Sequence, residues 1–179
     1  MTKAGLWIAL VGGALVTLGF AGLVRRGAEP GGIEDVWARI FGPPDLGPID
    51  FQTFRRRKTP NDALACPRGF CANAEPDIVP PLYPVSGERL RLIVAEAAMV
   101  DPDTQPIYAA RWEDHDRYLA RSRVFRFPDT IDVLVIEPAE NQATLAIYSR
   151  SQIGRADLGV NRARIERWLS RVDARMAGG

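Results

Sequence analysis

The feature that most constrains this chain is an apolar stretch near the N-terminus, where Gly5 to Val24 contains no charged side chain. Lys3 precedes the stretch, and Arg25 and Arg26 follow it. As an α-helix, such a stretch extends about 30 Å, which is enough to cross the hydrocarbon core of a bilayer. The sequence therefore predicts an N-terminal transmembrane anchor over residues 1–26.

A cleaved signal peptide is the competing interpretation of this stretch. Lys3 would then be its basic region, Leu6 to Leu18 its apolar core, and Gly19-Phe20-Ala21 its cleavage site. Two arginines would follow that site closely, which favours a retained anchor.

Small residues recur at every fourth position of the apolar stretch and would share one face of its helix. They are Gly5, Ala9, Gly13, Thr17 and Ala21. Such a stripe allows another membrane helix to approach closely, although a Gly- and Ala-rich helix also produces stripes by chance. Besides the lipid bilayer, we expect a membrane protein partner, or a second copy of the chain, to pack on this helix.

Charge and composition exclude several other functions. The 179 residues carry 23 basic and 22 acidic side chains, and this net charge of +1 provides no field to attract nucleic acid. One histidine and two cysteines are too few for a classical zinc site. We therefore expect no nucleic acid, metal or cofactor.

The sequence contains opposing signals for the side of the membrane that the C-terminal part occupies. More basic residues follow the span than precede it, which favours the cytoplasm. Cys66 and Cys71 are separated by a segment with Pro and Gly that suits a tight turn, so their thiols could meet. A disulfide there would persist outside the cytosol, whereas a reduced pair would fit a cytoplasmic loop.

Residues 27–84 are expected to join the anchor to a compact domain. Apolar residues with helical spacing predict a short amphipathic helix, which could lie in the membrane interface, on its own domain or on a partner. They are Ile33, Val36, Trp37, Ile40 and Phe41. Beyond Gly42, recurrent Pro and Gly predict an irregular linker, in which the basic run Arg55 to Lys58 is either solvated or in contact with lipid headgroups.

Residues 85–179 are predicted to form a compact α+β domain with the order αββββα. Ser86 can cap the first helix, and a second helix is expected from about Val160. Short connections between the strands, including a turn at Pro128-Asp129-Thr130, favour a four-stranded antiparallel meander with the two helices on one face. The expected strands are 106–112, 118–127, 131–137 and 143–149.

The segment between the last strand and the last helix has the most distinctive pattern. It resembles the signature RSxSRxGxxDLGxNxxRI of the domain-of-unknown-function 1499 family. The matching residues are Ser149, Ser151, Gly154, Asp157, Leu158, Gly159, Asn161, Arg164 and Ile165. Tyr148 and Gln152 stand where the family commonly has arginine, which weakens any anion site built on those arginines. The resemblance implies attachment to an envelope or lumenal membrane, and no activity is assigned to the family. With the cysteine pair, it leads us to expect a single-pass bacterial inner-membrane protein whose C-terminal domain lies in the periplasm.

This motif has a structural and a functional interpretation. Asp157 or Asn161 could accept hydrogen bonds at the helix start, and Arg164 could clamp Asp157 to a strand. Alternatively, Ser149, Ser151, Arg155 and Arg164 beside a helix N-terminus could bind a phosphate or a carboxylate.

Glu113 to Asp116 surround the single histidine, His115. These residues could hold a divalent cation or act as acid and base, although a solvated turn is the simpler interpretation.

Two classes of function therefore remain. The favoured class is a non-catalytic module that docks on a membrane complex as an accessory subunit and binds a protein or an anionic ligand. The alternative is an enzyme that uses a Ser/Arg/Asp pocket, which requires Ser151, Asp157 and Arg164 to converge on a deep cavity.

Overall fold

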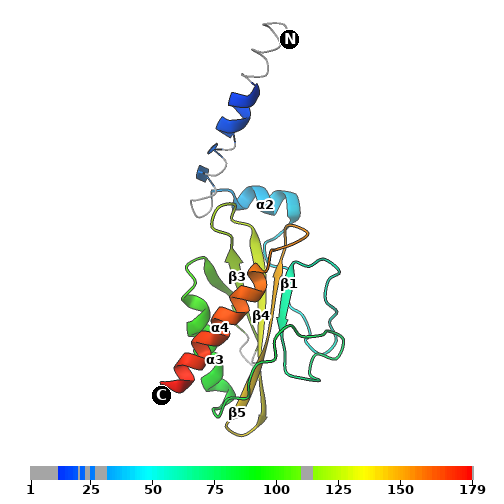
Figure 1. The fold of residues 1–179 in the computed structure, drawn as a ribbon, viewed down its shortest axis with the longest axis vertical. Helices are drawn as coiled ribbons and strands as arrows, with labels where there is room; N and C mark the ends of the chain where they lie inside the picture. The colour runs from blue at the N-terminus through cyan, green and yellow to red at the C-terminus, as the bar shows by residue number, and fades with distance from the viewer. Residues whose placement is uncertain (1–11, 20, 23–24, 27–31, 110–114, 179) are drawn as a thin grey trace.

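The computed structural model describes residues 12–19, 21–22, 25–26, 32–109 and 115–178. Beyond residue 31 they form an α+β fold built on one sheet of five antiparallel strands (Figure 1). Strands β2 to β5 form a meander, and β1 lies beside β5 at the other edge. The order of elements is α2 (Glu34–Phe41), β1 (Asp62–Ala65), α3 (Gly87–Met99), β2 (Thr104–Ala109), β3 (His115–Arg121), β4 (Pro128–Ala139), β5 (Gln142–Ser151) and α4 (Val160–Ala177).

Strand β1 corrects the expected four-stranded sheet. It pairs antiparallel with β5, opposite residues 147–150. The strand comes from the segment that the sequence predicts to be an irregular linker. A run of four residues between prolines is too short for its pattern to distinguish a strand from coil.

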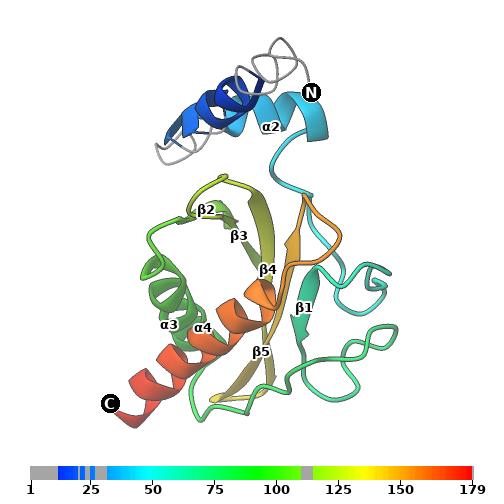
Figure 2. The same cartoon turned by 45° about the horizontal axis from the view of Figure 1, so that its top comes forward.

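Helices α3 and α4 cover one face of the sheet, as the pattern predicts (Figure 2). The Ser86 hydroxyl caps α3 by accepting a hydrogen bond from the backbone N–H of Arg89 at 3.3 Å. Trp168 of α4 is fully buried, and its ring lies edge-on to Tyr118 of β3 with centroids 5.4 Å apart. Burial in this core raises the pKa of Tyr118 to about 12.

The opposite face of the sheet is covered by residues 49–74. Phe51, Leu64 and Tyr148 are buried there together with Cys66 and Cys71. The two cysteines form the expected disulfide, with their Cα atoms 6.4 Å apart. The predicted linker is therefore one layer of the domain, and packing on the sheet extends N-terminal of residue 85.

The turn expected at Pro128-Asp129-Thr130 is instead the start of β4. Asp129 pairs with Ala120 of β3 and with Ser151 of β5. The chain reverses earlier, through residues 122–127, where the Ser122 hydroxyl accepts a hydrogen bond from the backbone N–H of Phe127. Pairing on both sides therefore overrides the turn preference of this tripeptide.

Within the described residues, none of the helices is both long and apolar enough to cross a membrane. Half of the apolar stretch 5–24 lies outside the described ranges, including Gly5 and Ala9 of the small-residue stripe. Gly13 and Thr17 lie in a described helical segment, 12–19, and Ala21 in another, 21–22.

Candidate functional site

The signature motif forms a buried hydrogen-bond network between β5 and α4. Asn161 and Arg164 project from the first turns of α4 toward Ser149, and all three residues are at most 5% exposed. The Ser149 hydroxyl donates to Asn161 Oδ1 at 2.6 Å and accepts from Arg164 Nη1 at 2.8 Å. Arg164 Nη1 also donates to Asn161 Oδ1 at 2.7 Å. The three side chains thus form hydrogen bonds to one another within the motif.

Arg164 is paired with Asp129, which is not the partner expected from the sequence. Its Nη2 lies 2.6 Å from Oδ2 of Asp129, a buried residue of β4. Asp129 and Ser149 share the helix-covered face of the sheet, because each lies two residues from a core isoleucine, Ile131 or Ile147. Only the pairing of β4 with β5 brings them beneath Arg164.

Asp157 accepts hydrogen bonds from the backbone at the start of α4 instead of pairing with Arg164. Its Oδ1 accepts a hydrogen bond from the backbone N–H of Gly159 at 3.1 Å, and its Oδ2 accepts one from that of Asn161 at 2.8 Å. Leu158 and Gly159 both adopt positive φ, 54° and 82°, to make this turn. The carboxylate therefore accepts hydrogen bonds from N–H groups at the helix start. These are the groups that an anion bound at this helix start would need to contact.

Asn61, which directly precedes the edge strand β1, extends the network beyond the motif. Asn161 Nδ2 donates to the backbone carbonyl of Asn61 at 3.1 Å and to the Ser151 hydroxyl at 2.9 Å. Asn61 Nδ2 in turn donates to the carbonyl of Gly154 at 2.8 Å. The sequence interpretation missed Asn61, because it lies ninety residues before Ser151 in the segment read as a linker.

An open pocket of about 680 Å³ lies beside the network. Three parts of the chain enclose it: the connection from α3 to β2, the β3–β4 turn and the N-terminal half of α4. Arg164 and Asp129 line it, whereas Ser151 and Asp157 do not. Arg155 is exposed and lies outside it. The Ser/Arg/Asp convergence that an enzyme would require is therefore not formed in this pocket.

Carboxylates neutralise most of the arginines around the pocket. Arg121 Nε lies 2.9 Å from Glu34 Oε2, and Asp101 accepts a hydrogen bond from Arg171 Nη2 at 2.7 Å. Desolvation opposes ionisation of Asp101, but the bonds from Arg171 and Trp168 outweigh it and hold the pKa of Asp101 below its usual value. Burial, followed by the like charge of Arg126, lowers the pKa of Arg121.

The acidic run around the histidine does not assemble a cation site among the described residues. Glu113 and Asp114 lie outside those residues, and Asp116 forms a two-point ion pair with Arg91 at 2.6 and 2.8 Å. His115 Nε2 lies 3.3 Å from Oδ1 of Asp132, on the opposite face of the sheet from Asp116. Alternation along β3 thus separates side chains that are consecutive in sequence.

Asp132 is a second polar centre that the sequence interpretation missed. It is fully buried, and its Oδ2 lies 3.1 Å from Arg150 Nη2. A lone carboxylate inside the apolar run 131–136 is the signal that could have identified it, because a buried charge requires a partner.

Fold and site together define an α+β domain whose strand-to-helix motif is locked to its sheet by a buried arginine–aspartate pair. Residues 54–172 match the family described as protein of unknown function (DUF1499), so the chain belongs to this family. No curated protein matches the chain closely enough to establish a relationship.

Proposed function

We propose that this protein is a membrane-tethered, non-catalytic module on the periplasmic side of a bacterial inner membrane. Its N-terminal helix docks on a membrane protein partner, and its folded domain offers a binding surface close to the bilayer. The observation that carries this proposal is the attachment of α2 to the domain.

Helix α2 is fixed to the β3–β4 turn by charge and by an aromatic contact. The Glu34 carboxylate bridges Arg121 and Arg126 at 2.9 Å each. Trp37 Nε1 donates to the Phe125 carbonyl at 2.6 Å, and its ring lies 5.1 Å from that of Phe127. Since α2 begins ten residues after the predicted span, this attachment would keep one end of the domain near the membrane.

Three residues in the last turn of α2 are exposed to solvent. Ile40 is 61% exposed and Phe41 is 47% exposed, and Arg39 of the same turn is exposed as well. Apolar side chains beside a basic one suit the boundary between headgroups and acyl chains. This supports a helix that contacts its own domain on one side and lipid on the other.

The signature network supports a non-catalytic role. The side chains of Ser149, Asn161 and Arg164 form hydrogen bonds to one another, and Arg164 also bonds Asp129. A nucleophile needs a base within hydrogen-bond reach, and Ser149 instead faces the amide of Asn161 and the guanidinium of Arg164. The Cys66–Cys71 disulfide supports the oxidising compartment.

Protease treatment of spheroplasts tests both the tether and the side of the membrane. The full chain should sediment with membranes after carbonate extraction and should lose its C-terminal domain to external protease, while a cytoplasmic marker stays intact. A chain released by carbonate would refute the anchor. A domain degraded only after lysis would place it in the cytoplasm.

A further inference from the structure

Two exposed arginines line the mouth of the pocket beside Arg164, and carboxylates neutralise one of them only weakly and the other not at all among the described residues. Arg123, on the β3–β4 turn, is exposed and forms no ion pair with any described residue. Arg167, on α4, lies 3.4 Å from Asp101, but that carboxylate already accepts shorter bonds from Arg171 and Trp168. The two arginines come from different walls of the pocket, so an anion at the mouth could contact both.

Much of the surface that lines the pocket is apolar. Pro102, Ala120, Val124, Phe125 and Val160 contribute to the lining. Val124 and Val160 remain 44% and 50% exposed. A free inorganic anion would leave these surfaces exposed to water, whereas an acyl chain would cover them.

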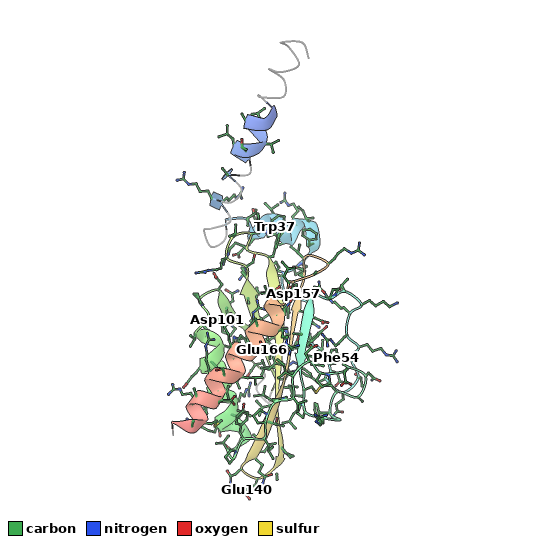
Figure 3. All side chains as sticks on the ribbon, in the orientation of Figure 1. Trp37, Phe54, Asp101, Glu140, Asp157 and Glu166 are labelled. Atoms are coloured by element: carbon green, nitrogen blue, oxygen red, sulfur yellow. A yellow bond between two sulfur atoms is a disulfide. The ribbon has the colours of Figure 1, made fainter. Side chains whose placement is uncertain are left out.

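The pocket shares one of its walls with the attachment site of α2. The β3–β4 turn lines the pocket, and the carbonyl of Phe125 in this turn accepts the hydrogen bond from Trp37 of α2. Figure 3 shows Trp37 and Asp157 at the end toward the N-terminal helix. There the loop before α4 presents Leu158, which is 98% exposed and held at a φ of 54°. Exposed apolar residues therefore surround this end of the domain: Ile40, Phe41, Val124, Leu158 and Val160.

We propose that this pocket binds a long-chain fatty carboxylate taken from the bilayer. The carboxylate lies between Arg123 and Arg167, and the acyl chain runs inward along Val124 and Val160 toward the Arg164–Asp129 pair. The volume of about 680 Å³ lies within the range of small-ligand sites. The inference rests on the proposed function, because the membrane-proximal position supplies the ligand.

Photolabelling of the full chain in phosphatidylcholine nanodiscs tests this proposal. The probe is palmitic acid with a diazirine on its chain, and labelled peptides are mapped by mass spectrometry. We expect labelling of residues 120–125 and of the start of α4, together with labelling of the N-terminal span by probe dissolved in the bilayer. The span serves as the internal reference. If it is not labelled, the membrane tether is wrong, independently of the result at the pocket.

Competition identifies the headgroup. Unlabelled palmitate should reduce pocket labelling at concentrations at least tenfold lower than hexadecanol, which lacks the charge. Inorganic phosphate should not compete. Equal competition by hexadecanol and palmitate would overturn the role of the arginines, and competition by phosphate would show a site for small anions.

Matched variants test the position of the ligand. Val124→Trp should fill the pocket and reduce the ratio of pocket to span labelling at least tenfold, and Arg123→Glu with Arg167→Glu should do the same. The controls are Val79→Trp, an equally exposed loop valine at 45%, and Arg175→Glu, an exposed arginine further along α4. An unchanged ratio in both pocket variants, with wild-type thermal melts, would refute the site.

Discussion

Arg164 Nη2 lies 2.6 Å from Oδ2 of Asp129, so the helix after the signature motif is attached to a strand that begins more than thirty residues earlier. Both side chains are at least nine-tenths buried. The pair connects α4 to the middle of the sheet, while Asp157 organises only the start of the helix. Because Asp129 is buried and paired whereas Asp157 only caps the helix, we expect Asp129 to contribute more to the stability of the fold than Asp157.

Loss of either partner of the buried pair should strongly destabilise the fold. Arg164→Ala leaves the Asp129 carboxylate buried without its counter-charge, which costs about 3–5 kcal/mol of unfolding free energy. Asp129→Ala should cost a similar amount, and the double variant should cost less than the sum. Asp157→Ala removes only a helix cap and should cost about 1 kcal/mol. Denaturant unfolding of the detergent-solubilised chain measures all four, and an Arg164→Ala curve that overlays the wild type would contradict the structural role.

The disulfide should stabilise the layer on the second face of the sheet. Replacing both Cys66 and Cys71 with alanine opens a loop of six residues and should lower the unfolding free energy by about 2 kcal/mol. In protein taken from its native membrane, neither thiol should react with an alkylating agent until a reductant is added. Quantitative alkylation without a reductant would contradict the oxidised state and would argue for the cytoplasm.

The small-residue stripe predicts a membrane contact that depends on side-chain volume. A Cβ added at Gly13 would meet no atom of the described chain, so Gly13→Leu should leave the fold and membrane insertion unchanged. Because leucine would prevent close approach of another helix, the variant should migrate as a smaller species than the wild type after mild detergent extraction. Gly12→Leu is the matched control, since Gly12 also has free space but lies off the stripe. Equal migration of all three proteins would show that the stripe does not pack on another helix and that the span only anchors the chain.

Helix α2 should detach when its acidic residue is removed. Glu34→Ala leaves Arg126, which is 7% exposed, paired mainly through Asp103. We expect faster hydrogen exchange in α2 and in the β3–β4 turn, without change in β5. Asp35→Ala is the control, because the Asp35 side chain is 68% exposed and its ion pair with Arg26 is long, at 3.6 Å. Identical exchange in the Glu34 variant and the wild type would show that the aromatic contacts of Trp37 are sufficient.

Acid should weaken the contact between the two helices. The pKa of Asp101 is lower in the folded chain than its usual value, so folding favours the charged carboxylate. Its contribution to stability is complete above the unfolded pKa of about 4 and is lost as the pH falls through the lower folded pKa. Thermal melts between pH 6 and pH 2 should show this loss as a falling melting temperature. Asp101→Asn should reduce the slope of the melting temperature against pH. An unchanged slope in the variant would assign the acid sensitivity to other carboxylates.

Sequence patterns determined those features of the protein that depend on neighbouring residues. The β-forming residues 143–149, which follow a turn-forming stretch, predicted a strand. The spacing of Ile165, Trp168, Leu169 and Val172 predicted the buried face of α4, because a helix has a fixed period. A turn of four residues was enough to predict that Cys66 and Cys71 meet. The pattern from Ser149 to Ile165 was enough to indicate the family.

Only the tertiary structure decided which distant residues meet. Strand β1 exists because β5 offers it an open edge, and Asp129 faces Arg164 because register places it two residues from Ile131 on the helix-covered side. The pocket likewise needs three walls, whose residues lie between Asp101 and Arg167 in the chain. Each of these features depends on how strands pair and layers pack, and a local pattern of residues contains no information about the partner that folding will bring to it.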